Sequence, residues 1–314
     1  MISKSAIVSV LKDSLKVKDN ELLTIITDKN KLFIAKDFYN TAKELNIQTE
    51  IYEIPVAQRH GEEPPEDIAL KILNCNVSIF ITTFSLSHTK ARRKASKKGV
   101  RIASMPGILP ETINRCLDID YDELKKICRK TADLIKENPK FEVRTDKGTY
   151  LTVSLGKNKL YGLHGATLDK PGNFGNLPDG EICFLPDNIE GVCIVDASVA
   201  GIGRLSEPIT IEIKQGKAVS IRGKESEKLI KILDSVGPNA YKIAEFGIGT
   251  NKKAKIIGSI LEDEKAMGTF HIAFGNDLSF GGDNNVPIHI DCVVSDASIK
   301  FDNQEMKLKD IAGK

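Results

Sequence analysis

The sequence lacks the features that mark several large classes of protein. No apolar run approaches the roughly 18–20 residues that a membrane-spanning helix needs. The first 20 residues carry charges through their apolar positions and have no small-residue cleavage site, so we expect a helix here and not a signal peptide. The net charge of +2 over 314 residues is too small to indicate a polyanionic partner. These absences predict a soluble globular protein that binds neither nucleic acid nor a membrane.

Cysteine motifs are also missing. No CxxC or zinc-ribbon spacing occurs, and the six cysteines are scattered, mostly in apolar stretches: Cys75, Cys116, Cys128, Cys183, Cys193 and Cys292. In a chain of this size the pattern indicates reduced, mostly buried thiols and a cytoplasmic location.

The motifs of common enzyme classes are absent. No GxGxxG follows the first strand-like run and no P-loop occurs, so little supports a nucleotide ligand. No GxSxG is present and no cysteine has a convincing histidine partner, which argues against a serine or cysteine nucleophile. The basic run at 90–101, KARRKASKKGVR, could contact phosphate, but a solvated helix face explains it equally well and no aromatic platform accompanies it.

The length of 314 residues favours two domains. Strand-like and helical runs alternate at first, with strands at 21–28, 48–54, 77–84 and 100–106 and helices at 33–45, 68–75 and 88–99. This rhythm predicts an α/β domain of Rossmann or flavodoxin type over residues 1–138, with a parallel sheet covered by helices. An amphipathic helix at 121–138, stopped by Pro139, marks the boundary.

From residue 139 the composition changes. Short strands separated by Gly, Asn and Asp turns dominate, 141–156 alternates and turns at DKG like a hairpin, and one clear helix is expected at 226–236. We therefore predict a mainly antiparallel β (α+β) domain over 139–314. It carries more acidic than basic residues, which favours a cation as its ligand.

Two short apolar runs of this domain, FHIAF and PIHIDCVV, each carry a histidine. His289 and Asp291 are two positions apart and share one face of a strand. His271 lies on the preceding strand, and the turn-rich loop GNDLSFGGDNN is long enough to return the chain beside it. Two imidazoles and a carboxylate can hold a first-row transition metal with positions left open. A buried His–Asp hydrogen bond is the alternative.

Two glutamates extend this candidate site. Glu181 begins an apolar strand in NLPDGEICFLP, and Glu245 ends one in AYKIAEFGIGT. A carboxylate buried in a strand is usually paired or metal-bound. Either residue alone could lie at the surface, but their presence in the same domain as the histidines favours a shared site.

Weaker candidates lie nearby. His164 stands among glycines in a loop that could close over a substrate, and Arg204 could clamp a substrate carboxylate. The charged run Glu262, Asp263 and Glu264 has the composition of a solvated face, although His271 follows closely enough to bring Asp263 or Glu264 near a metal.

The runs NLPDGEICFLP, AEFGIGTNKKAKIIGSILEDEKAMGTFHIAFGND and FGGDNNVPIHIDCVV resemble the M29 metallopeptidases, the aminopeptidase T family, and above all its short leucyl aminopeptidase-like members. The resemblance covers roughly residues 175–300. It implies a homodimer with two divalent ions, Zn, Co or Mn, held by Glu181, Glu245, His271, His289 and Asp291. The longer members also use a tyrosine shortly after the first histidine, where this chain has Leu278.

The resemblance predicts an aminopeptidase-like hydrolase that removes N-terminal residues from small peptides or amino-acid-derived substrates through a metal-activated water. Glu181 and Glu245 would be its catalytic carboxylates, as bridging ligand or as base. A related branch of this fold contains the iron-dependent 2,5-dihydroxypyridine dioxygenases. The alternative is thus one Fe(II) held by His271, His289 and Asp291 for ring-opening oxygen chemistry. A third possibility is a non-catalytic binding protein.

Overall fold

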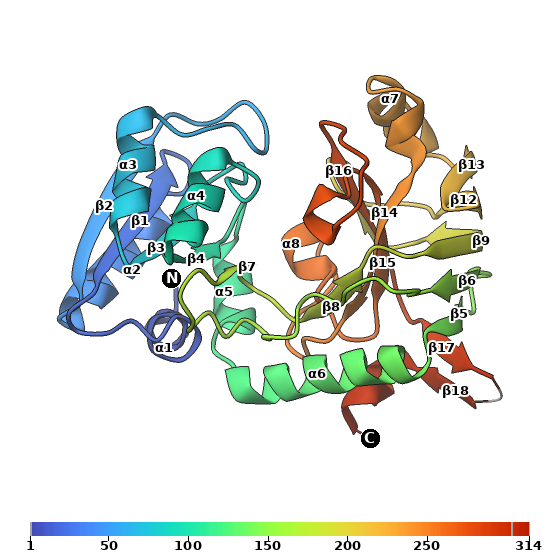
Figure 1. The fold of residues 1–314 in the computed structure, drawn as a ribbon, viewed down its shortest axis with the longest axis horizontal. Helices are drawn as coiled ribbons and strands as arrows, with labels where there is room; N and C mark the ends of the chain where they lie inside the picture. Colours follow the sequence, from blue (N-terminus) through green and yellow to red (C-terminus); the bar gives the residue numbers. More distant parts are fainter. Residues whose placement is uncertain (1, 303, 314) are drawn as a thin grey trace. The chain divides into compact units, whose positions relative to one another are not determined.

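The chain forms two compact units in the computed structural model, which describes residues 2–302 and 304–313 (Figure 1). Unit 1 comprises Met1–Glu123 and Ala166–Asp179, and unit 2 comprises Leu124–Gly165 and Gly180–Lys314. The boundary expected at residues 138/139 stays a prediction. None of the helices in the described ranges has the length and apolarity of a membrane span.

Unit 1 is built on a parallel five-stranded sheet in the order β2-β1-β3-β4-β7. The α/β prediction is therefore confirmed. Its strands are β1 (Leu22–Asp28), β2 (Gln48–Ile54), β3 (Val77–Ile81), β4 (Arg101–Ser104) and β7 (Phe174–Asn176). Its helical segments are α1 (Lys4–Ser9), the π-helical η1 (Val10–Ser14), α2 (Leu32–Glu44), α3 (Glu66–Asn74), α4 (Lys90–Lys98) and α5 (Pro110–Cys116).

The predicted helices connect these strands because their apolar faces have a sheet to cover. Ile68 and Ile72 of α3 and Ala95 of α4 pack with Ile26 and Phe80 of the sheet, and Figure 1 shows both helices over it. Every residue of β3 is buried, as expected for a central parallel strand with both faces covered.

The basic run lies on α4, where local signals determine both ends. The hydroxyl of Thr89 accepts a hydrogen bond from the Arg92 backbone N–H at 3.1 Å, which caps the helix. Gly99 follows the last turn with φ at 106°, a conformation that favours glycine. Ala91 and Ala95 are buried while most of the cationic side chains face solvent.

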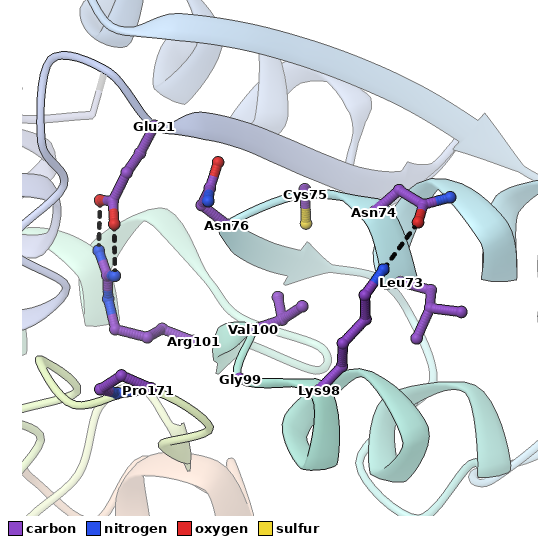
Figure 2. A pocket seen from close by; sticks show the side chains of 10 residues that line it. All are labelled: Glu21, Leu73, Asn74, Cys75, Asn76, Lys98, Gly99, Val100, Arg101 and Pro171. Carbon is purple, nitrogen blue, oxygen red and sulfur yellow. Dashed lines mark hydrogen bonds and ion pairs between the residues drawn. The ribbon is translucent and has the colours of Figure 1, made fainter.

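A buried ion pair joins the start of β1 to β4. Two guanidinium nitrogens of Arg101 donate to the two carboxylate oxygens of Glu21 at 2.8 and 2.7 Å, as Figure 2 shows. The backbone carbonyl of Leu15 accepts a further bond from Arg101 at 3.2 Å. These hydrogen bonds hold the pKa of Glu21 below its usual range.

Glu21→Ala is expected to lower the free energy of unfolding at pH 7 by about 3–5 kcal/mol, because it leaves a buried guanidinium unpaired. Since the pKa of Glu21 is lowered, its contribution is complete above the unfolded glutamate pKa of about 4.3 and is lost as the pH falls through the folded value. Urea unfolding from pH 7 down to pH 3 measures this. Glu44→Ala, which removes a surface pair with Lys4, is the control and should change little. Equal losses in the two variants would contradict the prediction.

Unit 2 contains two antiparallel sheets, which confirms the predicted β-rich part. The seven-stranded sheet has the order β13-β12-β9-β6-β5-β17-β18 and the six-stranded sheet the order β11-β10-β16-β15-β14-β8. The first comprises β5 (Lys140–Arg144), β6 (Tyr150–Ser154), β9 (Asn188–Val195), β12 (Ile209–Lys214), β13 (Lys217–Arg222), β17 (Ser298–Phe301) and β18 (Gln304–Lys307). The second comprises β8 (Glu181–Phe184), β10 (Ser198–Val199), β11 (Gly203–Arg204), β14 (Ile243–Gly249), β15 (Phe270–Gly275) and β16 (His289–Val294).

Helical segments complete this part of the chain: α6 (Tyr121–Glu137), α7 (Ser226–Asp234), α8 (Ile260–Asp263) and the 3₁₀ turns η2 (Pro238–Tyr241), η3 (Leu278–Phe280) and η4 (Leu308–Gly313). The helices α6 and α7 were predicted. The four residues of α8 are too few to show a helical period, so the sequence gives no signal for it.

A cluster of phenylalanines forms the centre of unit 2. The ring of Phe246 on β14 lies 5.5–5.7 Å, between centroids, from the rings of Phe141, Phe184 and Phe270. Phe246 is fully buried, and its two chain neighbours, Glu245 and Gly247, face the other side of the sheet. One face of β14 therefore builds the core and the opposite face is available for a polar site.

Phe246→Ala is expected to destabilise the protein by about 3–5 kcal/mol, because the cavity cannot close between three other rings. The midpoint of urea unfolding measures the loss. Val219→Ala is the control, since that side chain is 53% exposed and should change stability by less than about 0.5 kcal/mol. A Phe246→Ala effect as small as the control would mean that the cluster does not support the sheet.

Candidate metal site

Strand register brings the predicted site residues to one face of the six-stranded sheet. On β15 and β16, Ala273 lies opposite Asp291 and Gly275 opposite His289, which confirms the expected hairpin pairing. On β14, Gly247 lies opposite His271 and Glu245 opposite Ala273. Directly opposed residues in antiparallel strands point to the same side of the sheet, so both histidines face the same side as Asp291 and Glu245.

Glu181 joins this face from β8. Its partner in the register is Gly249 of β14, two positions beyond Gly247 and therefore on the same side. All five residues predicted to hold a metal are thus brought together by four adjacent strands, although Glu181 and Asp291 are far apart in the sequence.

Glu245 lies between the two imidazoles. Its Oε1 is 3.4 Å from Nε2 of His271, and its Oε2 is 2.9 Å from Nε2 of His289. Oδ1 of Asp291 is 3.4 Å from the same nitrogen of His289, and Oε2 of Glu181 is 3.6 Å from Nε2 of His271. Glu245 and His271 are 4% and 1% exposed, so water does not replace these contacts.

The backbone orients His289. Its Nδ1 donates a hydrogen bond to the carbonyl oxygen of Asn276 at 2.8 Å. This bond places the ring proton on Nδ1 and leaves Nε2 as the nitrogen that faces the acidic groups. A carbonyl partner on the remote nitrogen is the usual arrangement of a metal-ligating histidine.

A glycine makes room for His271. A Cβ added to Gly247 would lie 2.2 Å from both Cε1 and Nε2 of the imidazole, a distance that side chains do not adopt. Gly247 has no left-handed backbone angle, so the reason for glycine here is the close approach of the ring.

The carboxylates of this site stabilise positive charge on the groups beside them. Burial lowers the pKa of His271, but its hydrogen bond to Glu245 and the surrounding carboxylate charges outweigh burial and raise it to about 9. Burial lowers the pKa of His289 in the same way, but the charge of Asp291 acts against it. The pKa of His289 therefore rises well above its usual range. Burial also raises the pKa of Glu264 to about 8. Protons on the imidazoles or a bound cation can supply the missing charge.

Three groups of donor atoms in this cluster have the spacing of metal ligands, and one of them consists of Glu181, Cys183 and Glu245. The ligand atoms of Glu245, His289 and Asp291 lie within 4.8 Å of one another. Those of Glu181, Glu264 and His271 do so as well. Mixed imidazole and carboxylate donors suit Fe(II), Mn, Co and Zn, so the residues present fit a divalent transition metal.

The charged run at 262–264 is buried, and the expectation of a solvated face was wrong. Asp263 accepts hydrogen bonds from the hydroxyl of Ser198 at 2.7 Å and from the backbone of Ile257 and Gly258 at 2.7 and 2.9 Å, so it anchors a loop. A carboxylate oxygen of Glu264 lies within 4.8 Å of the ligand atoms of Glu181 and His271. Arg204 is exposed on β11, and His164 is partly buried.

Lys265 was not predicted as a site residue. It is 1% exposed, and its Nζ lies 2.6 Å from Oε1 of Glu181 and 2.5 Å from Oε1 of Glu264. In the sequence it follows three acidic residues, a pattern that is equally common on exposed helices. Only the burial of this run shows that the ammonium belongs to the site.

A two-unit α/β and antiparallel β chain with imidazoles and carboxylates gathered on one sheet face has the architecture of a metal-dependent enzyme. The family model for 2,5-dihydroxypyridine 5,6-dioxygenase, NicX, matches residues 9–309. The chain therefore belongs to this family. No curated protein matches it.

Two solved structures are similar to the chain. The 2,5-dihydroxypyridine dioxygenase from Pseudomonas putida KT2440 superimposes with a TM-score of 0.83 at 20% identity, over 97% of this chain and 95% of that one. Wild-type AmpT from Thermus thermophilus gives a TM-score of 0.63 at 15% identity, over 97% of both chains. At these identities the likeness shows the fold.

The prediction of an M29 aminopeptidase, and with it a hydrolase or protease, was wrong, because the family match assigns the chain to the dioxygenase family. The relationship to aminopeptidase T is one of fold. The motifs that suggested a peptidase are the strands that carry the acidic groups and histidines. Such a donor set selects a cation, whereas the reaction depends on how many ions bind and what surrounds them.

Proposed function

We propose that this protein is a mononuclear Fe(II) dioxygenase that opens the ring of a dihydroxylated pyridine with O₂. The family-model match over residues 9–309 carries the proposal. The buried imidazole and carboxylate donors support it, since they suit Fe(II).

In this proposal Glu245, His271, His289 and Asp291 hold the ion. Bound Fe(II) supplies the one-electron chemistry that lets O₂ react with an aromatic ring. The Asn276 carbonyl keeps Nε2 of His289 directed at the ion, as its hydrogen bond to Nδ1 requires. Glu245 and His271 are buried, which excludes water from their part of the site.

Glu181 is the base in this proposal. Its Oε1 pairs with the Lys265 ammonium at 2.6 Å, and its Oε2 faces Nε2 of His271 at 3.6 Å. A carboxylate held in this way beside the metal can accept the proton of a ring hydroxyl as the substrate binds.

Two aromatic side chains beside the candidate metal ligands suit a planar substrate. The ring of Phe280 stacks near His289, with centroids 6.0 Å apart at 28°, and Tyr161 meets Phe280 edge-on at 5.3 Å. A flat ring can stack on such a surface while its hydroxyls reach the metal.

Phe280→Ala is expected to raise KM about 2- to 13-fold with a smaller effect on kcat, because a stacking interaction of about 0.5–1.5 kcal/mol is lost before the ring reacts. Steady-state oxygen uptake separates the two constants. Leu278→Ala, an exposed position on the same 3₁₀ turn, is the matched control and should leave KM unchanged. A fall in kcat at constant KM would contradict a binding role.

The activity is tested on protein prepared without oxygen and loaded with Fe(II). On adding 2,5-dihydroxypyridine, the oxygen electrode should record one O₂ consumed per ring lost, and ¹⁸O₂ should place both heavy atoms in the product. Leucine p-nitroanilide should not be hydrolysed. An iron-loaded protein that consumes no O₂ with dihydroxypyridines or catechols would overturn the proposal.

We also propose a cytoplasmic location, supported by the six buried thiols, and a homodimer, which the resemblance implied. Cell fractionation and light scattering test these two points.

A further inference from the structure

Lys265 places its ammonium group among the candidate metal ligands. Its side chain is 1% exposed, and its ammonium contacts carboxylates from two different parts of the chain, Glu181 of β8 and Glu264 at the end of α8. A lysine is almost never fully buried unless it is paired, and here both partners lie within 2.6 Å.

The backbone around Lys265 is held in place as well. Its N–H donates to the Glu262 carbonyl at 3.0 Å, and its own carbonyl accepts from the Asn251 N–H at 2.9 Å. Met267 N–H donates in turn to the Asn251 carbonyl at 3.1 Å. The ammonium is therefore presented by a segment fixed to the end of β14.

Two of the three donor groups differ in the side chains that they contact. Glu181 and Glu264 belong to the group completed by His271, and both carboxylates bind the ammonium. The other group, Glu245, His289 and Asp291, has its own spacing of ligand atoms, and His271 also adjoins it, since its Nε2 lies 3.4 Å from Oε1 of Glu245. A divalent ion in the first group would have to displace Lys265 from both carboxylates against charge repulsion.

We infer that Lys265 takes the place of a second cation and is the reason that the proposed mononuclear site holds a single divalent ion. The inference rests on the proposed metal site and deepens it. An ammonium neutralises the carboxylates but cannot coordinate or activate a water molecule. A hydrolytic centre with two metal ions therefore cannot form. A single ion with open coordination positions can still bind and support oxygen chemistry.

The test counts metal ions. The protein is treated with chelator, saturated with Mn²⁺, separated from free metal, and measured by elemental mass spectrometry and electron paramagnetic resonance. The wild type should hold one Mn²⁺ per chain with the spectrum of an isolated ion. Lys265→Met should hold two with an exchange-coupled spectrum, and Lys265→Arg, which keeps the charge, should hold one.

Thermal unfolding adds a second measurement. Lys265→Met frees Glu181 and Glu264 to bind an additional ion in the folded state, so saturating Mn²⁺ should raise the Tm of Lys265→Met more than that of the wild type. One ion in a folded Lys265→Met with no extra gain in Tm would overturn the inference and leave the proposed function standing. Two ions in the wild type would overturn both the inference and the mononuclear site of the proposed function.

The absence of any metal in the wild type would overturn the proposed metal site itself. If Lys265→Met does not fold, the number of Mn²⁺ ions bound per chain is measured in Lys265→Gln instead. The wild-type and Lys265→Arg counts stand in either case, and two ions in either protein would still overturn the inference.

Discussion

His289→Ala and Asp291→Ala are each expected to abolish retention of iron while the protein stays folded. His289 supplies an imidazole nitrogen that the Asn276 carbonyl orients, and Asp291 supplies the carboxylate beside it. Changes in the partners of a ligand already cost about 10–100-fold in metal affinity, so the loss of a ligand should exceed about 100-fold. Iron per chain after gel filtration, measured by elemental analysis, gives the result, and circular dichroism verifies the fold.

Asp263→Asn is the matched control for these variants. Asp263 is a buried carboxylate of the same unit, but it accepts hydrogen bonds from Ser198 and the loop backbone. Its replacement should keep the iron and lower only stability. Unchanged iron content in both His289→Ala and Asp291→Ala would contradict the proposed iron site. Iron loss in Asp263→Asn alone would show that the iron binds near Asp263 instead.

Gly247→Ala is expected to expel iron with a single methyl group. The added Cβ would lie 2.2 Å from Nε2 and Cε1 of His271, so the imidazole must leave its place between Glu181 and Glu245. Overpacking of this kind costs about 1–3 kcal/mol of stability. We expect at least about a 10-fold loss of iron affinity, measured by competition with a chelator of known affinity.

The control for this prediction is a double-mutant cycle. The clash at Gly247 is with the His271 ring, so Gly247→Ala should cost little stability in a His271→Ala background. A similar cost in both backgrounds would show that the methyl group disturbs β14 itself. Full iron content in Gly247→Ala would show that His271 is not held as a ligand.

The regular elements were predictable because their signals are local. Apolar runs separated by helical periods indicated β1 to β4 and the helices between them, and the structure has them within a few residues of the predicted bounds. The pair His289 and Asp291 follows from the two-residue period of a strand, and the turn-rich loop before it indicated the hairpin with His271.

Features that depend on distant parts of the chain were not predictable in this way. Lys265 lies in a charged run of ordinary composition, and only Glu181, far back in the sequence, explains its burial. Gly247 has the appearance of any strand glycine until His271 of the next strand lies against it. Nor did composition show that residues 166–179 return to unit 1 and add β7 beside β4.

The sequence by itself determined the strands and helices and the alternation that places each acidic or imidazole group on one side of its strand, and it therefore indicated a candidate metal site in the β-rich part. The tertiary structure decided which of these groups meet and that a lysine stands among them. The physical reason is that strand periodicity acts over two residues, whereas the charge balance of a buried site is summed over every chain segment that reaches it.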